Sequence, residues 1–195
     1  MEVTTADGWP NKGQWKDADL MVLYLWNHDW SPERLGELDA FLARGGGVVA
    51  LHTALIADKE PEALARRFGL AAQPVRTKYR HGPLDLEIVA PPDHPITRGL
   101  KAARYVDETY WPMVGDAAKV DVLATAVEEG KSHPMLWTFK AGKGRVFGSV
   151  LGHHSWTLDD PLFRIPILRG MAWAAHEPAG RFERLALEGM RPAEK

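Results

Sequence analysis

Cysteine is absent from the 195 residues of this chain. Its absence excludes disulfide bonds, thiolate zinc sites, iron–sulfur clusters and every mechanism that uses a cysteine nucleophile. Basic residues are not in excess either, because 24 Lys and Arg stand against 26 Asp and Glu, which gives a net charge of −2. A surface that binds the phosphate backbone of a nucleic acid needs an excess of Lys and Arg, so we expect no nucleic-acid partner.

Long apolar runs are missing as well. No stretch approaches the roughly 20 residues that cross a bilayer, and residues 1–5 have neither the basic start nor the apolar centre of a signal peptide. We therefore expect a cytoplasmic protein with no membrane partner. The length is typical of one domain, and no linker or repeat divides the chain. The sequence predicts a single domain over residues 1–195, with residues 178–195 as a polar surface tail.

Two apolar runs with a helical pattern between them predict a strand–helix–strand unit. Residues 18–26 and 48–51 are each typical of a strand buried on both faces. Between them, Ser31 and Pro32 suit the start of a helix, and Gly45 suits its end. Because a helix joins the two strands, we expect a right-handed parallel crossover.

The rest of the chain continues the α/β pattern. Further elements are predicted as a short helix at 61–68, strands at 84–89, 120–127, 135–139 and 145–151, and a closing helix from 161. We expect an α/β fold with a doubly wound, mostly parallel sheet flanked by helices, similar to the flavodoxin-like three-layer sandwich.

Histidines and tryptophans gather where predicted strands end, which is where open α/β sheets bind ligands. The residues that follow the first, second and last of these strands are Trp26, Asn27 and Trp30, then His52, then His153 and His154. We interpret His52 and His153 as candidate catalytic residues and the others as candidate substrate-binding residues. The alternative for each histidine is a structural hydrogen bond.

Asp107 and Glu108 are the acidic candidates, and Tyr110 and Trp111 follow them. We interpret Glu108 as a candidate catalytic residue and the other three as candidate substrate-binding residues. A carboxylate beside imidazoles can act as a general base, orient a histidine or complete a metal site. The neighbouring aromatic rings favour a sugar-binding surface, and the alternative is an exposed acidic pair on a loop. No close metal-ligand spacing such as His-Glu-x-x-His occurs. The sequence therefore specifies no cofactor and leaves a divalent metal as an open alternative.

Motifs for nucleotide binding and serine hydrolysis are absent. The chain has no Gly-x-Gly-x-x-Gly, no P-loop and no Gly-x-Ser-x-Gly elbow. The Gly142-Lys143-Gly144 segment lies between two predicted strands and is too short for a P-loop, so we interpret it as a hairpin turn.

Seven segments in register resemble the trehalose-utilisation, ThuA-like family. They are residues 45–52, 94–100, 107–110, 134–137, 142–147, 151–153 and 171–175. Their order and spacing agree with the family from about Thr4 to the C-terminal region. The resemblance implies a class I glutamine amidotransferase-like fold.

The resemblance also implies roles for particular residues. It places His52 where amidotransferases of this fold carry their cysteine nucleophile, so glutaminase chemistry is excluded. His52, Glu108 and His153 match family positions that line the pocket, and His81 lies where the family tends to have a histidine. Family members begin with another strand and helix before the segment that matches residues 3–5. Without that first strand the core would have a gap, and three alternatives stay open: another chain supplies the missing piece, the start is misassigned, or the chain is a fragment. We expect a homo-oligomer.

The family is associated with disaccharides and related glycosides, often beside sugar dehydrogenases that make 3-keto derivatives. We therefore expect an enzyme that uses His/Glu acid–base chemistry on a small-molecule sugar, by elimination, hydrolysis or isomerisation. His52 would be the base and Glu108 or His153 the acid. The rings expected to stack on sugar faces are Trp26, Trp30 and Trp111. The alternatives are a non-catalytic carbohydrate-binding module and a structural subunit.

Overall fold

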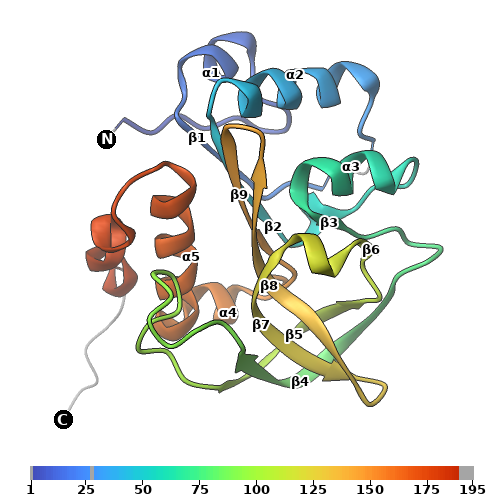
Figure 1. The fold of residues 1–195 in the computed structure, drawn as a ribbon, viewed down its shortest axis with the longest axis vertical. Coiled ribbons are helices and arrows are strands. Elements are labelled where there is room, and N and C mark those ends of the chain that lie inside the picture. The colour runs from blue at the N-terminus through green and yellow to red at the C-terminus, as the bar shows by residue number, and fades with distance from the viewer. Residues whose placement is uncertain (1, 27–28, 189–195) are drawn as a thin grey trace.

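A computed structural model of the chain describes residues 2–26 and 29–188 (Figure 1). Its helices are α1 (Lys12–Asp17), α2 (Pro32–Ala43), α3 (Pro61–Phe68), α4 (Ser155–Asp159) and α5 (Pro161–Ala174), with 3-10 helices η1 (His52–Leu55), η2 (Ala117–Lys119) and η3 (Ala179–Leu187). Its strands are β1 (Leu20–Leu23), β2 (Gly47–Leu51), β3 (Leu70–Ala71), β4 (Lys78–Ile88), β5 (Ala103–Trp111), β6 (Val114–Gly115), β7 (Asp121–Glu128), β8 (Lys131–Ala141) and β9 (Gly144–Ser149).

The main sheet has seven strands in the order β1-β2-β9-β8-β7-β4-β5. β1, β2 and β9 are parallel, whereas β8, β7, β4 and β5 each pair antiparallel with the preceding strand of that order. The prediction of an α/β fold is confirmed. The prediction that the sheet is doubly wound and mostly parallel is wrong, because the sheet is mixed. The reason is local: two-residue turns at 129–130 and 142–143 join β7 to β8 and β8 to β9, and such turns allow only antiparallel pairing.

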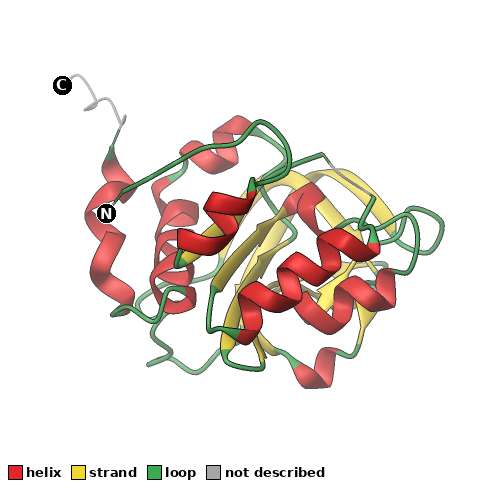
Figure 2. Ribbon diagram, turned by 90° about the horizontal axis from the view of Figure 1, so that it is seen from above, coloured by secondary structure: helices red, strands yellow, loops and turns green. Residues whose placement is uncertain are grey.

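The predicted strand–helix–strand unit is confirmed as β1–α2–β2, and its two strands pair in parallel. Ser31 caps α2 by accepting a hydrogen bond from the backbone N–H of Arg34. The side chains of Leu38 and Phe41 turn from α2 into the core. α2 and α3 cover one face of the parallel strands, and α5 covers the other (Figures 1 and 2). This arrangement buries both faces of β2, as its continuous apolar run predicts.

β4 and β5 form a long antiparallel ribbon, and the sequence pattern did not predict β5. They pair from Lys78 opposite Trp111 to Leu86 opposite Ala103. β4 pairs with β7 through two residues at its end, and residues 107–111 of β5 are all buried (Figure 1). The acidic pair at positions 107 and 108 therefore lies in a buried strand, and the alternative of an exposed loop is wrong.

The segment after α5 was expected to be a surface tail. Its described part forms η3, which packs beside α5 and buries Ala186. Residues 189–195 of that expected tail lie outside the described residues. Over the described ranges, no helix combines the length and the apolar character needed to cross a membrane.

Candidate functional site

His52 directly follows β2 and adopts a left-handed backbone conformation with φ of +53°, which residues other than glycine rarely adopt. Its Nδ1 lies 3.0 Å from the carbonyl oxygen of Val150. A carbonyl can only accept, so Nδ1 carries the proton and the lone pair of the neutral ring is on Nε2. Burial lowers the pKa of His52, although the Val150 carbonyl and the charge of Glu108 act in the opposite direction.

His153 follows β9, the strand beside β2, and a buried carboxylate fixes its backbone. Asp107 accepts hydrogen bonds of 3.0 Å from the N–H groups of both Gly152 and His153. Gly152 has φ of +125°, a conformation that suits glycine. Asp107 is fully buried and also accepts from the N–H of Glu108. The prediction that Asp107 binds substrate is therefore wrong, because its oxygens already serve the backbone and no ligand can reach them.

Glu108 is the centre of the cluster. Its Oε2 lies 3.2 Å from Nε2 of His52 and 3.1 Å from Nδ1 of His153. Its Oε1 lies 3.3 Å from Nε2 of His81, the residue opposite it in the β4–β5 ribbon. The structure thus brings together all four predicted catalytic residues, from β4, β5 and the segments that follow β2 and β9.

Tyr110 lies beside this carboxylate on the same face of β5. Its hydroxyl donates a hydrogen bond of 3.1 Å to Oε2 of Glu108, and its ring stacks on that of His52 at 5.3 Å between centroids. Burial and the charge of Glu108 raise the pKa of Tyr110. The phenol therefore stays protonated and acts as a permanent donor to Glu108. Tyr110 is almost fully buried, so its role is to hold Glu108 and not to contact substrate as predicted.

Exposure separates the four catalytic candidates into two layers. The side chains of His81 and His153 are 45% and 37% exposed, whereas those of His52 and Glu108 are 3% and 8% exposed. The two outer rings meet edge to face, with centroids 4.6 Å apart. A ligand from solvent can therefore touch His81 and His153, and His52 and Glu108 lie behind them.

Two exposed aromatic rings lie beside the outer layer formed by His81 and His153. Trp156 is 56% exposed and stacks on His154, whose ring lies 4.6 Å from that of His153. Tyr79 is 66% exposed and meets the edge of His81. Sequence analysis assigned no role to these two aromatic residues. The signal for Tyr79 is its position two residues before His81, because alternate residues of a strand share a face.

Of the three tryptophans predicted to stack on a sugar, two are buried and one is exposed. The prediction for Trp30 is wrong, because its ring is buried against Phe68 and its Nε1 donates to the carbonyl oxygen of Ile56. The prediction for Trp111 is wrong for a similar reason, since this residue is only 6% exposed at the end of β5. Trp26 is exposed after β1. Asn27, the other substrate-binding candidate of that segment, lies outside the described residues.

The cluster also contains donor atoms of the kind that bind metal ions. Two sets of three side chains hold ligand atoms within 4.8 Å of one another: His52, Glu108 and His153, and His81, His153 and His154. His153 belongs to both sets.

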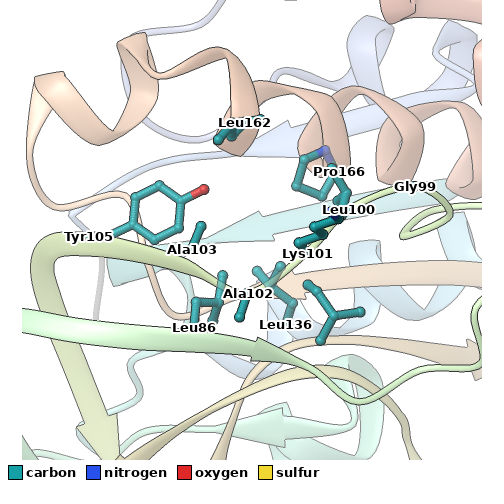
Figure 3. A pocket seen from close by; sticks show the side chains of 11 residues that line it. Leu86, Gly99, Leu100, Lys101, Ala102, Ala103, Tyr105, Leu136, Leu162 and Pro166 are labelled. Atoms are coloured by element: carbon teal, nitrogen blue, oxygen red, sulfur yellow. The ribbon is translucent and has the colours of Figure 1, made fainter.

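A separate cavity of about 250 Å³ lies between the start of α5 and the β4–β5 ribbon (Figure 3). Its lining is mostly apolar, with Leu86, Tyr105, Leu136 and Leu162 among the residues around it. Burial raises the pKa of Tyr105 to about 12, so its hydroxyl is a neutral group there. The described residues that line this cavity do not include the histidines or Glu108, so it is not the site of the polar cluster.

The protein is thus an α/β protein whose mixed sheet carries a His/Glu cluster beside its parallel strand ends. A sequence model of the trehalose-utilisation family, ThuA, matches residues 2–174. The chain belongs to this family, which indicates a carbohydrate-related role. No curated protein matches it significantly.

Similar solved structures include two ThuA-like proteins. The one from Parabacteroides merdae is 25% identical, with a TM-score of 0.67 over 89% of this chain and 77% of that chain. The one from Bacteroides uniformis is 16% identical, with a TM-score of 0.64 over 86% of this chain and 75% of that chain. A beta-galactosidase from Bacillus circulans is 13% identical, with a TM-score of 0.54 over 82% of this chain and 22% of that chain, and shows likeness of fold alone.

Proposed function

We propose that this protein is an enzyme that acts on a glycoside or disaccharide in its 3-keto form by acid–base chemistry. The observation that carries the proposal is the meeting of two solvent-accessible imidazoles, His81 and His153, at one buried carboxylate. Imidazole is the side chain whose ordinary pKa suits proton transfer near neutral pH, and a buried carboxylate can orient it.

His81 is the base in this proposal. A proton on its Nε2 faces Oε1 of Glu108, which leaves the lone pair on Nδ1 of a half-exposed ring. This differs from the expectation that His52 is the base. The side chain of His52 is almost fully buried behind His153, so His52 supports the outer ring and does not meet the sugar.

The reaction follows from the acidity of a C–H bond beside a ketone. His81 removes the proton from the carbon between the ketone and the anomeric carbon. The electron pair of that C–H bond forms a C=C bond, and the bond from the anomeric carbon to the glycosidic oxygen breaks. His153 protonates the departing oxygen, so one proton is taken up and one is released. Addition of water to the resulting enone completes a net hydrolysis.

Turnover of matched sugars tests the proposal. We expect the protein to convert a 3-keto-glycoside and to leave the parent glycoside, which lacks the acidic C–H bond, unchanged. His81→Gln and His153→Gln should each lower kcat/KM by about 10²–10⁴-fold. His176→Asn is the matched control, because His176 is an exposed histidine beyond α5. Equal turnover by His81→Gln and the unaltered protein would contradict the proposed base.

The exposed rings of Tyr79 and Trp156 favour a second candidate, a non-catalytic carbohydrate-binding module. Such a module needs aromatic faces that stack on sugar rings but no proton transfer. In that case Trp156→Ala would abolish sugar binding measured by calorimetry, whereas His81→Gln would leave it unchanged. No 3-keto-glycoside would be converted by any variant.

A further inference from the structure

We propose that His52, Glu108 and His153 together bind one divalent transition-metal ion. The three candidate ligand atoms are Nε2 of His52, Oε2 of Glu108 and Nδ1 of His153. Their mutual distances are 3.0 Å between the two nitrogens, 3.1 Å from His153 to Glu108 and 3.2 Å from His52 to Glu108. Three donor atoms therefore form a nearly equilateral triangle.

This triangle has the size of one face of a metal coordination sphere. Bonds of about 2.0–2.2 Å, at angles of about 90–110°, separate neighbouring ligand atoms by about 2.8–3.6 Å. An ion about 2.1 Å from each atom would lie about 1.1 Å out of their plane. Two imidazoles and one carboxylate suit zinc, iron, cobalt, nickel or manganese better than magnesium or calcium, which prefer oxygen.

Hydrogen bonding within the cluster leaves one contact unexplained. His52 donates from Nδ1 to the carbonyl of Val150, so its Nε2 presents a lone pair. A proton on Nδ1 of His153 can bridge to His52 or to Glu108. The remaining contact, between Nε2 of His52 and Oε2 of Glu108, joins two acceptors at 3.2 Å in a buried place. The Tyr110 hydroxyl lies 3.3 Å from that Nε2 and 3.1 Å from that Oε2, but it can donate its single proton to only one of them. A cation at the centre satisfies all three lone pairs at once.

The surroundings of the triangle hold each ligand as metal sites require. Ligating histidines usually donate their other ring N–H to a carbonyl or carboxylate, as His52 does to Val150. Glu108 is held by the hydroxyl of Tyr110. The backbone of His153 is fixed by Asp107, so the ligand atoms are positioned before any ion binds.

A bound ion goes beyond the proposed reaction and is compatible with it. It would supply a positive charge to polarise a sugar carbonyl or hydroxyl oxygen. His81 is not one of the three ligands, so its Nδ1 remains available as a base. Nε2 of His153 still carries its proton when Nδ1 is a ligand.

Direct metal binding tests the site without any sugar. The full chain is stripped with a chelator and titrated with Zn²⁺ by calorimetry, and with Co²⁺ while its visible absorption is recorded. We expect one ion per chain. Glu108→Gln and His153→Ala should each weaken Zn²⁺ binding by at least about 100-fold, because loss of a ligand exceeds the effect of losing a supporting residue. Circular dichroism confirms that each variant is folded.

Two histidine variants serve as controls. His176→Asn removes a distant imidazole and should bind Zn²⁺ with unchanged affinity. His154→Gln should also bind within about threefold of the unaltered chain, which separates this site from the set of His81, His153 and His154. Loss of binding in His154→Gln with retention in Glu108→Gln would overturn the assignment.

The remaining outcomes distinguish the two proposals. Failure of the unaltered chain to bind either ion stoichiometrically would overturn the metal site and assign the close contact to a shared proton. Stoichiometric binding without turnover of a 3-keto-glycoside would support the metal site and contradict the proposed function. Turnover in the presence of chelator by a chain that binds no ion would support the proposed function and contradict the metal site.

Discussion

Glu108 and Glu128 are two buried carboxylates at the β4–β5 ribbon, and their partners differ in kind. Glu128 receives hydrogen bonds of 3.0 and 2.5 Å from the guanidinium of Arg80 and one of 2.8 Å from the hydroxyl of Thr109. Glu108 instead faces the imidazoles described above and the hydroxyl of Tyr110. One carboxylate has a permanent cation, and the other has partners that can exchange protons or bind an ion.

The ribbon produces this difference by simple alternation. Arg80 lies opposite Thr109 across the ribbon, and the next pair is His81 opposite Glu108. Because successive residues of a strand point to opposite faces, one pair meets Glu128 of β7 and the other meets His52 and His153. We conclude that the same two strands present a structural ion pair on one face and the candidate active site on the other.

The largest expected effect comes from Glu108→Gln. This change keeps the size of the side chain but removes the charge that orients His81 and His153. We expect kcat/KM for a 3-keto-glycoside to fall by about 10²–10⁴-fold. The free energy of unfolding in urea should change less than it does for Glu128→Gln. Activity near that of the unaltered protein would remove the distinction between the two carboxylates.

The opposite result is expected from Glu128→Gln. Loss of the carboxylate leaves Arg80 and Thr109 without their buried acceptor, which should lower the free energy of unfolding by about 1–3 kcal/mol. Turnover at a temperature where the variant is folded should stay within a few-fold. Urea denaturation measures the first quantity, and a large loss of turnover in the folded variant would show that the two faces are coupled.

Tyr110→Phe should have a smaller effect and sharpen the comparison. It removes the hydroxyl that donates to Glu108 but keeps the ring that stacks on His52. One neutral hydrogen bond is worth about 1 kcal/mol, so we expect kcat/KM to fall about fivefold. A fall as large as that of Glu108→Gln would mean that Tyr110 itself transfers a proton.

Much of the framework follows from local sequence patterns. The strand–helix–strand unit is set by two apolar runs and a capped helix, and His52 and His153 follow the neighbouring parallel strands β2 and β9. The rule that ligands bind beyond such strand ends therefore predicts that these two residues meet. Trp30 shows the limit of that rule, because a ring placed after a strand can turn into the core.

The β4–β5 ribbon could not be predicted in the same way. Residues 103–111 mix charged and aromatic side chains, so they lack the apolar alternation that marks a half-buried strand. Their pairing depends on long-range register, which brings Glu108 opposite His81. The burial of Asp107 likewise depends on backbone N–H groups that are distant in sequence. Such contacts leave no periodic signal.

The smallest expected effect is a difference in the acid limb of stability. Burial acts to raise the pKa of Glu128, but hydrogen bonds from Arg80 and Thr109 outweigh it and lower the pKa below its ordinary value of 4.5. Near that value the unfolded chain binds this proton more readily than the folded chain. The contribution of Glu128 is therefore fully present above pH 4.5 and is lost as pH falls through the folded pKa. The difference in unfolding free energy between the unaltered protein and Glu128→Gln should shrink over that window. A difference that stays constant down to acid unfolding would mean that the carboxylate stabilises the ribbon by packing and not by charge.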